Sequence, residues 1–507
     1  MRRSLLVASA LSLCVVLTLA RAAAAAAADV PPEVQRQLDA LARENAALRR
    51  AVEELADQVR AARDEARAAR TESSSEAPSA PGAPAAGDAP GGAPSLAPGG
   101  ARLQLLDLSL DGMIAAGWSQ AEGERLEILQ GGGHDPRQRG FTLQQAELSL
   151  KGAVDPFFTG EAHLLYQLDP EGESRFELEE AFVTTMRLPF ALHERGAQLE
   201  LGHFLTEFGR INPQHAHQWD WLDQPVVATR LFGEDGMRAP GVRLGWLLPL
   251  PWFSELHLGA QNARGETMLS FLASDEAFEE RAIGGRPYAA AGVRSPADLL
   301  YLARWVNGAD LSDTTSAQLG VSFATGPNAS GRDGRTHLLG ADLVVKWRPL
   351  ASDRGWPFVT FQAEWMGRRY EADGFSLCLD EDDCAASTIA VPGDALEDHG
   401  FYAQLLYGFR RGWAAGLRVE HASGHGRSFD LAASRAAGAA VFAPADDDPY
   451  RGDRTRIAPL LVFHPSEFSR LRLQANWDRA DADFVGDALS VWAGLEFLFG
   501  AHPAHAY

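Results

Sequence analysis

The stretch SEFSRLRLQANWD, residues 466–478, alternates strictly between polar and apolar side chains from its first arginine onward. A period of two residues predicts a β-strand whose two faces meet different surroundings. One face presents Leu471, Leu473, Ala475 and Trp477, and the other presents Arg470, Arg472, Gln474, Asn476 and Asp478. A single strand of this kind fits a half-exposed strand of a soluble sandwich as well as a strand with lipid on one side, so the rest of the chain has to decide.

Sixteen segments of this kind follow one another along the chain. They begin near residues 105, 141, 157, 175, 196, 240, 253, 300, 315, 335, 356, 397, 412, 455, 469 and 487. Short connections alternate with longer ones, and the long ones are 120–140, 206–239, 264–299, 371–396 and 423–454. A meander with tight turns at one end and long loops at the other is typical of transmembrane barrels. The pattern predicts an all-β transmembrane barrel of about 16 antiparallel strands over residues 101–507, with both of its ends on the short-turn side.

The two faces of these segments differ in the same way throughout the barrel. Apolar faces include Leu108, Leu110, Ile114 and Trp118 in the first segment and Trp413, Leu417 and Val419 in the thirteenth; polar faces include Asp107, Asp111, Glu147, Arg418 and Glu420. Polar inner faces do not suit the dry core of a soluble sandwich, but they suit a water-filled lumen. We therefore expect Leu471 and Trp477 to face lipid, and Arg470 and Arg472 to face water inside a pore.

Three segments of different character precede the barrel. Residues 1–28 have a basic start, a short apolar run and an alanine-rich end, which predicts a secretory signal peptide. Residues 30–70 carry a heptad seam with valine and leucine at its core positions and Asn45 at an a position, which predicts a short periplasmic coiled coil and favours a parallel dimer. Residues 71–100 are rich in Pro, Gly and Ala, which predicts a disordered linker.

Composition narrows the classes of function. The chain has 46 Lys and Arg against 68 Asp and Glu, a net charge of −22, which argues against a nucleic-acid partner. No local motif supports a serine–histidine–acid site, so we expect no enzymatic activity and no cofactor. Because an exported protein meets an oxidising environment, we expect Cys378 and Cys384 to form a disulfide.

The connection after the fifth segment, Thr206 to Pro240, is the candidate for setting selectivity. It carries Arg210, Arg230 and Arg238, and a long loop that folds into a barrel can narrow the passage with its charges. The same loop contains His215 and His217 near Asp220 and Asp223. His-x-His spacing can serve a metal ion, yet hydrogen bonding of the loop to the barrel wall explains the same residues, so we predict no metal site and keep His215 and His217 as weak candidates.

The stretches GFTLQQAELSLKGAVDPFF, LELGHFLTEFGRINP and SEFSRLRLQANWD resemble a known family. Together they are similar to the phosphate-selective porins (porins O and P) of Gram-negative outer membranes, in a distant branch of that family. The resemblance covers roughly residues 101–507. It implies a barrel of 16 strands, usually trimeric, with an inward-folded third loop and arginines along an anion path. On this chain the path arginines would be Arg210, Arg230, Arg238, Arg243, Arg418, Arg456, Arg470 and Arg472.

Two features depart from the resemblance. Phosphate selection in that family relies on a cluster of lysines, whereas Lys151 and Lys346 are the only lysines here. The end of the chain, HPAHAY, interrupts the alternation that usually closes such a barrel, so Phe497 and Phe499 are the expected closing residues. We therefore expect weak selectivity, with anions such as phosphate somewhat preferred.

Three hypotheses of function follow from these patterns. The leading one is an outer-membrane porin for passive diffusion of small hydrophilic solutes or anions. It would be surrounded by lipid and lipopolysaccharide and would form a homo-oligomer, either a trimer as in the family or a dimer by the coiled-coil rules. The second is a TonB-dependent-like uptake receptor for a metal such as zinc or for another ligand, although such receptors have about 22 strands and a plug. The third is a tether between the outer membrane and the cell wall.

Overall fold

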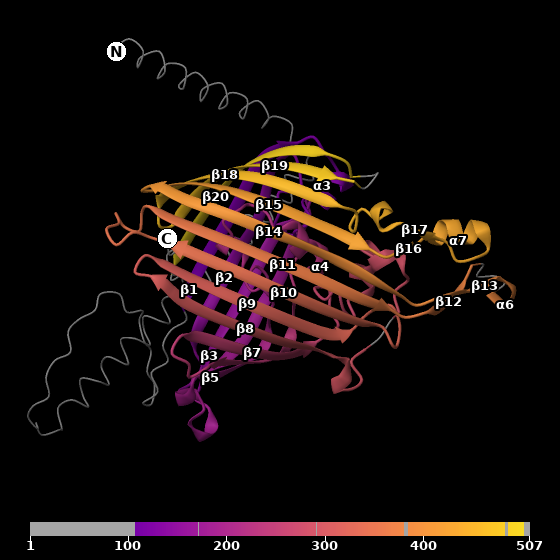
Figure 1. Cartoon of the computed structure of the whole chain (residues 1–507), viewed down its shortest axis with the longest axis horizontal. Helices are drawn as coiled ribbons and strands as arrows, with labels where there is room; N and C mark the ends of the chain where they lie inside the picture. Colours follow the sequence, from indigo (N-terminus) through magenta and orange to yellow (C-terminus); the bar gives the residue numbers. More distant parts are fainter. Residues whose placement is uncertain (1–106, 171, 290–291, 380–383, 482–484, 501–507) are drawn as a thin grey trace, which may run out of the picture. The chain divides into compact units, whose positions relative to one another are not determined.

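The computed structural model describes residues 107–500, apart from 171, 290–291, 380–383 and 482–484. Sixteen antiparallel strands pair in chain order and close into a barrel where β1 meets β20 (Figure 1). The barrel strands are β1 (Asp107–Ser119), β2 (Gly140–Ala153), β3 (Phe158–Leu168), β4 (Ser174–Thr185), β5 (Ala197–Leu205), β6 (Arg238–Leu247), β7 (Phe253–Asn262), β8 (Leu299–Ser312), β9 (Thr315–Pro327), β10 (Arg335–Trp347), β11 (Phe358–Ala372), β14 (Asp394–Arg410), β15 (Trp413–His425), β18 (Arg454–Ser466), β19 (Ser469–Ala480) and β20 (Ala488–Gly500). Each predicted segment is found, and the predicted all-β barrel is confirmed.

The remaining elements lie in the connections. Helices are α3 (Glu124–Leu129), α4 (Val226–Phe232), α5 (Asp275–Glu280), α6 (Cys384–Ser387) and α7 (Leu431–Ala437), with single 3₁₀ turns η1 (Pro189–Ala191), η2 (His193–Arg195), η3 (Ala216–Gln218), η4 (Ile283–Gly285), η5 (Pro296–Asp298) and η7 (Ala445–Asp447). Two small hairpins pair β12 (Phe375–Cys378) with β13 (Thr388–Val391) and β16 (Ser428–Phe429) with β17 (Phe442–Ala443). Within the described part of the chain, no helix is both long and apolar enough to cross a bilayer.

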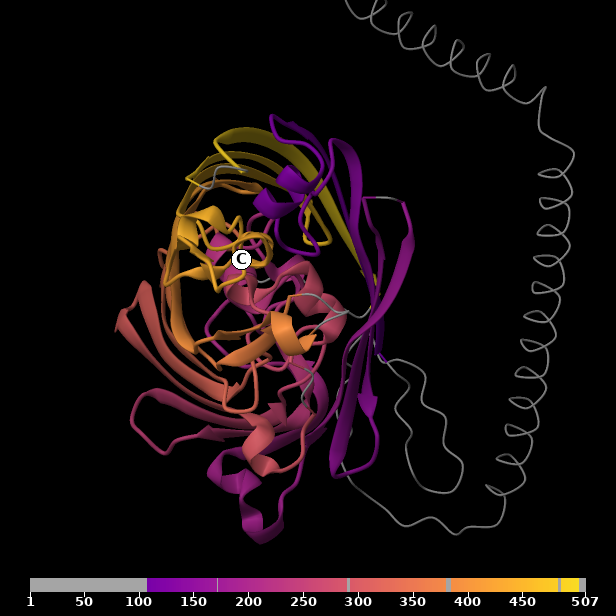
Figure 2. The same ribbon diagram turned by 90° about the vertical axis from the view of Figure 1, so that its right-hand side faces the viewer.

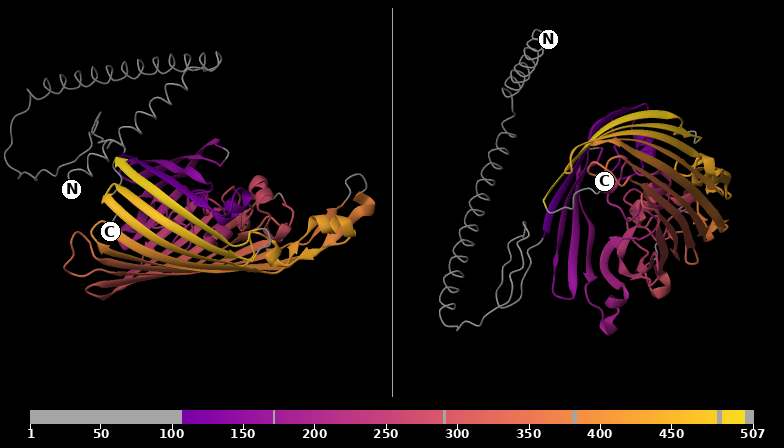
Figure 3. Two further views of the ribbon diagram at one scale, coloured as in Figure 1. Left: turned by 90° about the horizontal axis from the view of Figure 1, so that it is seen from above. Right: turned by 60° about the vertical axis from the view of Figure 1, so that its left-hand side comes forward.

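Long and short connections alternate around the barrel as predicted. The end that carries the long connections is called the loop side below, and the opposite end the turn side. Figure 3 shows both small hairpins and α7 projecting from the loop side. The first residue of β1 and the last of β20 lie on the turn side, which confirms the prediction for the two ends of the barrel.

The outer face of the wall is apolar and the inner face is polar. In β19, Leu471, Leu473 and Trp477 are 42%, 51% and 58% exposed, whereas Arg470 and Arg472, which alternate with the leucines, are buried. Soluble proteins place these residue types the other way round. An apolar exterior around a polar interior is the arrangement of a barrel that stands in lipid.

Exposed aromatic side chains gather near both ends of the strands. Trp118, Phe141 and Tyr301 are exposed close to the loop side, and Phe409 and Phe499 close to the turn side. Aromatic girdles at the two interfaces of the bilayer are a feature of transmembrane barrels. The exterior is therefore a membrane-spanning surface bounded at both edges.

Two smaller predictions have definite outcomes. Cys378 and Cys384 form a disulfide with their Cα atoms 5.0 Å apart, as predicted. Phe497 and Phe499 of β20 pair with Gly112 and Leu110 of β1, so they close the barrel. The predicted signal peptide, coiled coil and linker, and the HPAHAY end, lie outside the described residues.

Candidate functional site in the barrel lumen

The connection between β5 and β6, residues 206–237, is called L3 below, and it folds into the barrel. Figure 2 looks along the barrel from the loop side, with helical segments inside the ring of strands. Every residue of α4 is buried, and α4 contacts β11, β14 and β15. L3 contributes these residues to an apolar cluster shared with strand residues: Phe208, Ile211, Ala216, Trp219, Val226, Val227, Ala228, Leu231, Phe232 and Met237. The inward-folded third loop is thus confirmed, and apolar packing helps to hold it inside.

Asp223 of L3 is held by two arginines of the barrel wall. Arg456 Nη1 lies 2.8 Å from its Oδ2, and Arg418 donates to its Oδ1 and to its main-chain carbonyl. Gln474 Nε2 donates to Oδ1 at 2.8 Å, and Asn476 donates to Oδ2. Burial alone would raise the pKa of Asp223, but Arg418 and Arg456 lower it to about 2. The carboxylate therefore stays charged and fastens L3 to β15, β18 and β19.

Arg470 and Arg472 point into the barrel, where other groups cover most of their surface. Both are buried and both contact Oε2 of Glu496 on β20, Arg472 at 2.8 Å. Arg470 also donates to the carbonyl of His217 at 2.8 Å, and Arg472 to the carbonyl of Trp219 at 3.0 Å. The expectation that the pair lines a water-filled path is corrected for Arg472, whereas Arg470 still borders the turn-side cavity described below. The physical reason is that L3 covers them and takes their N–H groups for its main-chain carbonyls.

Arg230, Arg238 and Arg243 are paired as well. Arg230 donates to main-chain carbonyls of the loop 426–453, with Nη1 3.1 Å from the carbonyl of Arg451. Arg238 is buried and contacts Glu177. Arg243 Nε lies 2.7 Å from Glu200, and the same guanidinium contacts Glu207. Burial and pairing leave these groups little freedom to attract a passing anion.

Cavities lie on both sides of L3. The turn-side cavity measures about 1170 Å³, and its charged lining is nearly balanced: Arg210, Lys346, Arg348, Arg418 and Arg470 against Asp220, Asp223, Asp310 and Asp313. The loop-side cavity measures about 670 Å³ and its charged lining is mostly acidic: Glu124, Glu127, Asp135, Asp169, Glu177, Glu234, Asp235, Glu266 and Glu276 against Arg137, Arg175 and Arg281. The two mouths of the lumen therefore differ in charge.

A buried cluster of histidines and glutamates joins L3 to the wall at β2, β3 and β4. Glu147 is at its centre: Oε1 lies 2.7 Å from Nδ1 of His163, and Oε2 lies 3.1 Å from Nδ1 of His217 and 3.7 Å from Nδ1 of His215. His215 also contacts both Glu179 and Glu180, at 2.9 Å each. All six of these side chains are less than a tenth exposed.

A break in the register of β4 explains why adjacent glutamates share this cluster. His163 of β3 pairs with Glu180 and Leu164 pairs with Leu178, which leaves Glu179 as the extra residue of a β-bulge. A bulge re-aims side chains and allows two neighbours to face the same side of a sheet. Glu179 and Glu180 are consequently both buried inside the barrel.

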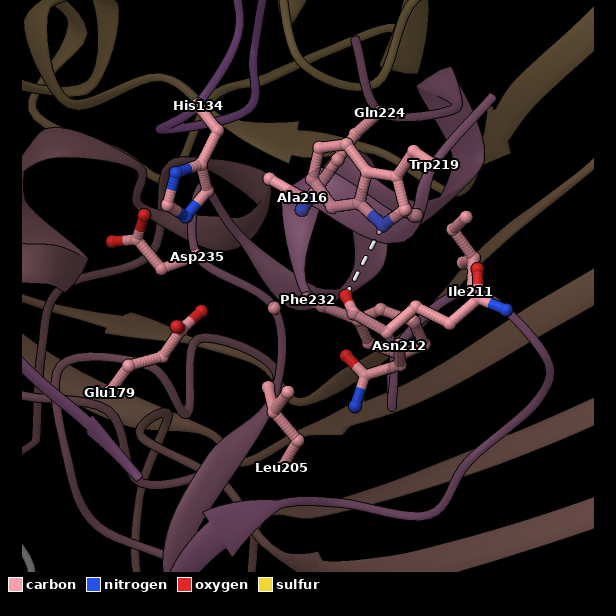
Figure 4. Close-up of a pocket in the computed structure, with 13 residues that line it drawn as sticks. His134, Glu179, Leu205, Ile211, Asn212, Ala216, Trp219, Gln224, Phe232 and Asp235 are labelled. Atoms are coloured by element: carbon pink, nitrogen blue, oxygen red, sulfur yellow. Dashed lines mark hydrogen bonds between the residues drawn. The ribbon is translucent and has the colours of Figure 1, made fainter. Parts of the chain in front are cut away.

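The cluster adjoins a small pocket of about 10 Å³, roughly the size of one water molecule. Figure 4 shows Glu179 and Asp235 on the same side of this pocket as the His134 ring, with Trp219 on the other side. Burial lowers the pKa of His134 to about 4, so this imidazole is neutral near neutral pH. Burial opposes a charge on His215 as well, but Glu179 and Glu147 raise its pKa well above the ordinary value.

Sequence reasoning found part of this site. It singled out His215 and His217, but it placed them beside Asp220 and Asp223, whereas Asp223 binds the arginines of the wall instead. Their actual partners, Glu147, His163 and the two glutamates of β4, come from strands far away in the sequence. The sequence signal that could have indicated the bulge is the pair of adjacent acids, Glu179 and Glu180, which interrupts the alternation of the strand.

A search of family models finds no match to this chain. The chain is 30% identical over 394 residues to an uncharacterized protein of Aquifex aeolicus (strain VF5), covering 74% of this chain and 73% of that protein. The chain belongs to the same family as this Aquifex protein. Membership in porins O and P stays a prediction.

Several solved structures have similar folds at low sequence identity. An anion-selective porin from Comamonas acidovorans has a TM-score of 0.42 at 9% identity, over 78% of this chain and all of that chain. The outer-membrane channel DcaP of Acinetobacter baumannii has a TM-score of 0.44 at 11% identity, over 78% and 96% of the two chains. The strand pairing described above, and not these likenesses, establishes the barrel.

Proposed function

We propose that this protein is an outer-membrane channel through which small hydrophilic solutes diffuse passively, with L3 setting the width of the path. The observation that carries the proposal is the pair of cavities on opposite sides of L3 inside a closed barrel with a lipid-facing exterior. Barrels of 16 to 18 strands can hold an aqueous channel. The proposal assigns the protein no enzymatic activity.

The proposed ion preference is weak and leans towards anions. Arg210 and Lys346 line the turn-side cavity next to L3, where side-chain charges affect a passing ion most strongly. The mostly acidic lining of the loop-side cavity favours cations and so opposes this preference. Since most of the predicted path arginines are paired with carboxylates or carbonyls, the proposal includes no tight phosphate site.

The proposal places the barrel in the outer membrane of a Gram-negative bacterium, among lipid and lipopolysaccharide, as a homo-oligomer. Trimer, dimer and a link to the cell wall all stay open, because the coiled coil that bears on them lies outside the described residues. A TonB-dependent-like receptor is the weaker alternative, since such receptors have about 22 strands and this barrel has sixteen.

Planar-bilayer recording of the purified full-length protein tests the proposal. We expect discrete conductance steps without an energy source, and a small reversal potential of the anion-selective sign in a salt gradient. Detergent alone and heat-unfolded protein are the controls. A correctly folded protein that inserts into the bilayer yet never conducts would overturn the channel function, and a strongly cation-selective current would overturn the proposed preference.

A further inference from the structure

We infer that Glu147, His163 and His215 form a binding site for a divalent transition-metal ion of the zinc class. One ligand atom from each of these three buried side chains lies within 4.8 Å of the others. The residues come from β2, β3 and L3 and are brought together only by the fold. The inference rests on this geometry and does not depend on the proposed transport function.

The distances between ligand atoms are close to those that a metal ion requires. Zinc binds imidazole nitrogen and carboxylate oxygen at about 2.0–2.2 Å, so two ligand atoms of a tetrahedral site are roughly 3.3 Å apart. Oε1 of Glu147 lies 2.7 Å from Nδ1 of His163, and Oε2 of Glu147 lies 3.7 Å from Nδ1 of His215. The three ligand atoms all lie within 4.8 Å of one another, so adjustment of the side chains can bring them around one ion without rearranging the strands.

The far nitrogens of both histidines already have carboxylate partners. His163 Nε2 lies 3.2 Å from Glu161, and His215 Nε2 lies 2.9 Å from Glu180. Metal-binding histidines almost always donate their second N–H to a carboxylate or carbonyl, which fixes the ring and raises its basicity as a ligand. This outer set of carboxylates is independent of the three proposed ligands and points to the same use of the cluster.

Further groups can complete the coordination. Glu179 lies 2.9 Å from Nδ1 of His215, and His217 Nδ1 lies 3.1 Å from Glu147. Either side chain supplies a fourth ligand atom of the kind that zinc accepts. Imidazole nitrogen favours zinc, cobalt, nickel and copper over calcium and magnesium, which prefer oxygen.

The charge of the cluster also suits a dication. Glu147, Glu179 and Glu180 are buried together, and buried carboxylates are costly unless they are paired or bind a metal. Arg238 is 3.9 Å from Glu179, and the close partners of the carboxylates are the histidines themselves, so a dication would take over the pairing when it displaces the histidine protons. Because His215 belongs to L3 and the other two ligands to β2 and β3, a bound ion would fasten L3 to the wall at a second place, in addition to the contacts of Asp223 with β15, β18 and β19.

Metal binding by the full-length protein, purified in detergent without a histidine tag and stripped with a chelator, tests the inference. We expect one zinc ion per chain after desalting, measured by elemental analysis, and the visible absorption of a tetrahedral site with Co²⁺. Glu147→Gln and His215→Gln should abolish both signals. Glu180→Gln, which removes only an outer partner, should weaken affinity about 10–100-fold.

His257→Gln is the matched control, because His257 contacts a glutamate, Glu255, on β7 outside the cluster. It should bind zinc as the unaltered protein does. Equal zinc retention by the unaltered protein, Glu147→Gln and His215→Gln would overturn the inference, because the metal would then bind elsewhere. If the variants do not fold, the unaltered protein alone decides: absence of the tetrahedral Co²⁺ absorption overturns the site, whether or not the protein conducts ions.

Discussion

Arg456 of β18 and Asp223 of L3 form a buried ion pair between the barrel wall and the loop, with Nη1 and Oδ2 2.8 Å apart although the two residues are 233 positions apart in the sequence. Asp223 binds Arg418 as well, and Arg456 binds Asp478 of β19 at 2.9 Å. The loop is thus part of a charge network that includes three neighbouring strands. Arg418 also contacts Glu420 at 2.7 Å, so each arginine has a carboxylate of its own strand region and Asp223 is the carboxylate that they share.

Asp223→Asn should destabilise the protein by about 1.5–3 kcal/mol, because Arg418 and Arg456 would lose charge-assisted hydrogen bonds to L3 while keeping Glu420 and Asp478. Urea unfolding in lipid vesicles measures the loss. Asp446→Asn, in an exposed part of the loop 426–453, is the charge-matched control and should have little effect. Equal stability of the two variants would mean that the network does not hold L3.

The contribution of Asp223 should disappear in acid. Its pKa is lowered from 3.8 to about 2 in the folded protein, so the unfolded chain binds a proton first as the pH falls. The stabilisation is therefore complete above pH 3.8 and is lost as the pH falls through about 2. We expect the stability difference between the unaltered protein and Asp223→Asn to narrow over this window. A constant difference down to pH 2 would contradict the assignment.

Arg210→Ala should shift the reversal potential towards cation selectivity, because Arg210 lines the turn-side cavity next to L3. Arg195→Ala removes the same charge from an exposed turn outside the lumen and serves as the control. Its effect should be small, since the field of an exposed charge fades over about 8 Å in physiological salt. Equal shifts in both variants would show that the constriction lies elsewhere.

Leu473→Arg should destabilise the barrel in lipid by about 2–4 kcal/mol, the cost of arginine near the middle of a bilayer. Leu473 is in the middle of β19 and 51% exposed. Leu311→Arg, at the turn-side end of β8, should cost about 0–1 kcal/mol because the interface tolerates charge. Unfolding in vesicles compares the two. A similar cost at both depths would place the membrane differently on the barrel.

The barrel could be predicted from sequence because each strand reports its own surroundings. The alternation at Leu471, Arg472 and Leu473 follows from the pleat of one strand between lipid and lumen, and no distant partner is needed to recognise it. The same holds for the tight turns and for the nearby Cys378 and Cys384. Local patterns of this kind can be recognised without knowing which strands are neighbours.

The state of the inner charges could not be predicted in the same way. An inward arginine such as Arg472 has the same sequence pattern whether it faces water or the carbonyl of Trp219, and only the path of L3 decides between them. The histidine cluster also depends on a one-residue register shift at Glu179. The amino-acid sequence around Glu179 does not show which residue of the strand is shifted. Such sites depend on long-range geometry that a period of two residues does not encode.

The placement of L3 has a consequence for how the chain is assembled. The apolar side chains of L3 pack inside the ring, and its Asp223 is bound by arginines of strands that are synthesised more than 190 residues later. Until β15 and β18 are present, this loop has neither its arginine partners nor its covering wall, and early exposure of apolar surface promotes aggregation. Insertion of the loop and closure of the ring at β1 and β20 must therefore be coupled, which gives folding a late and strongly non-local step.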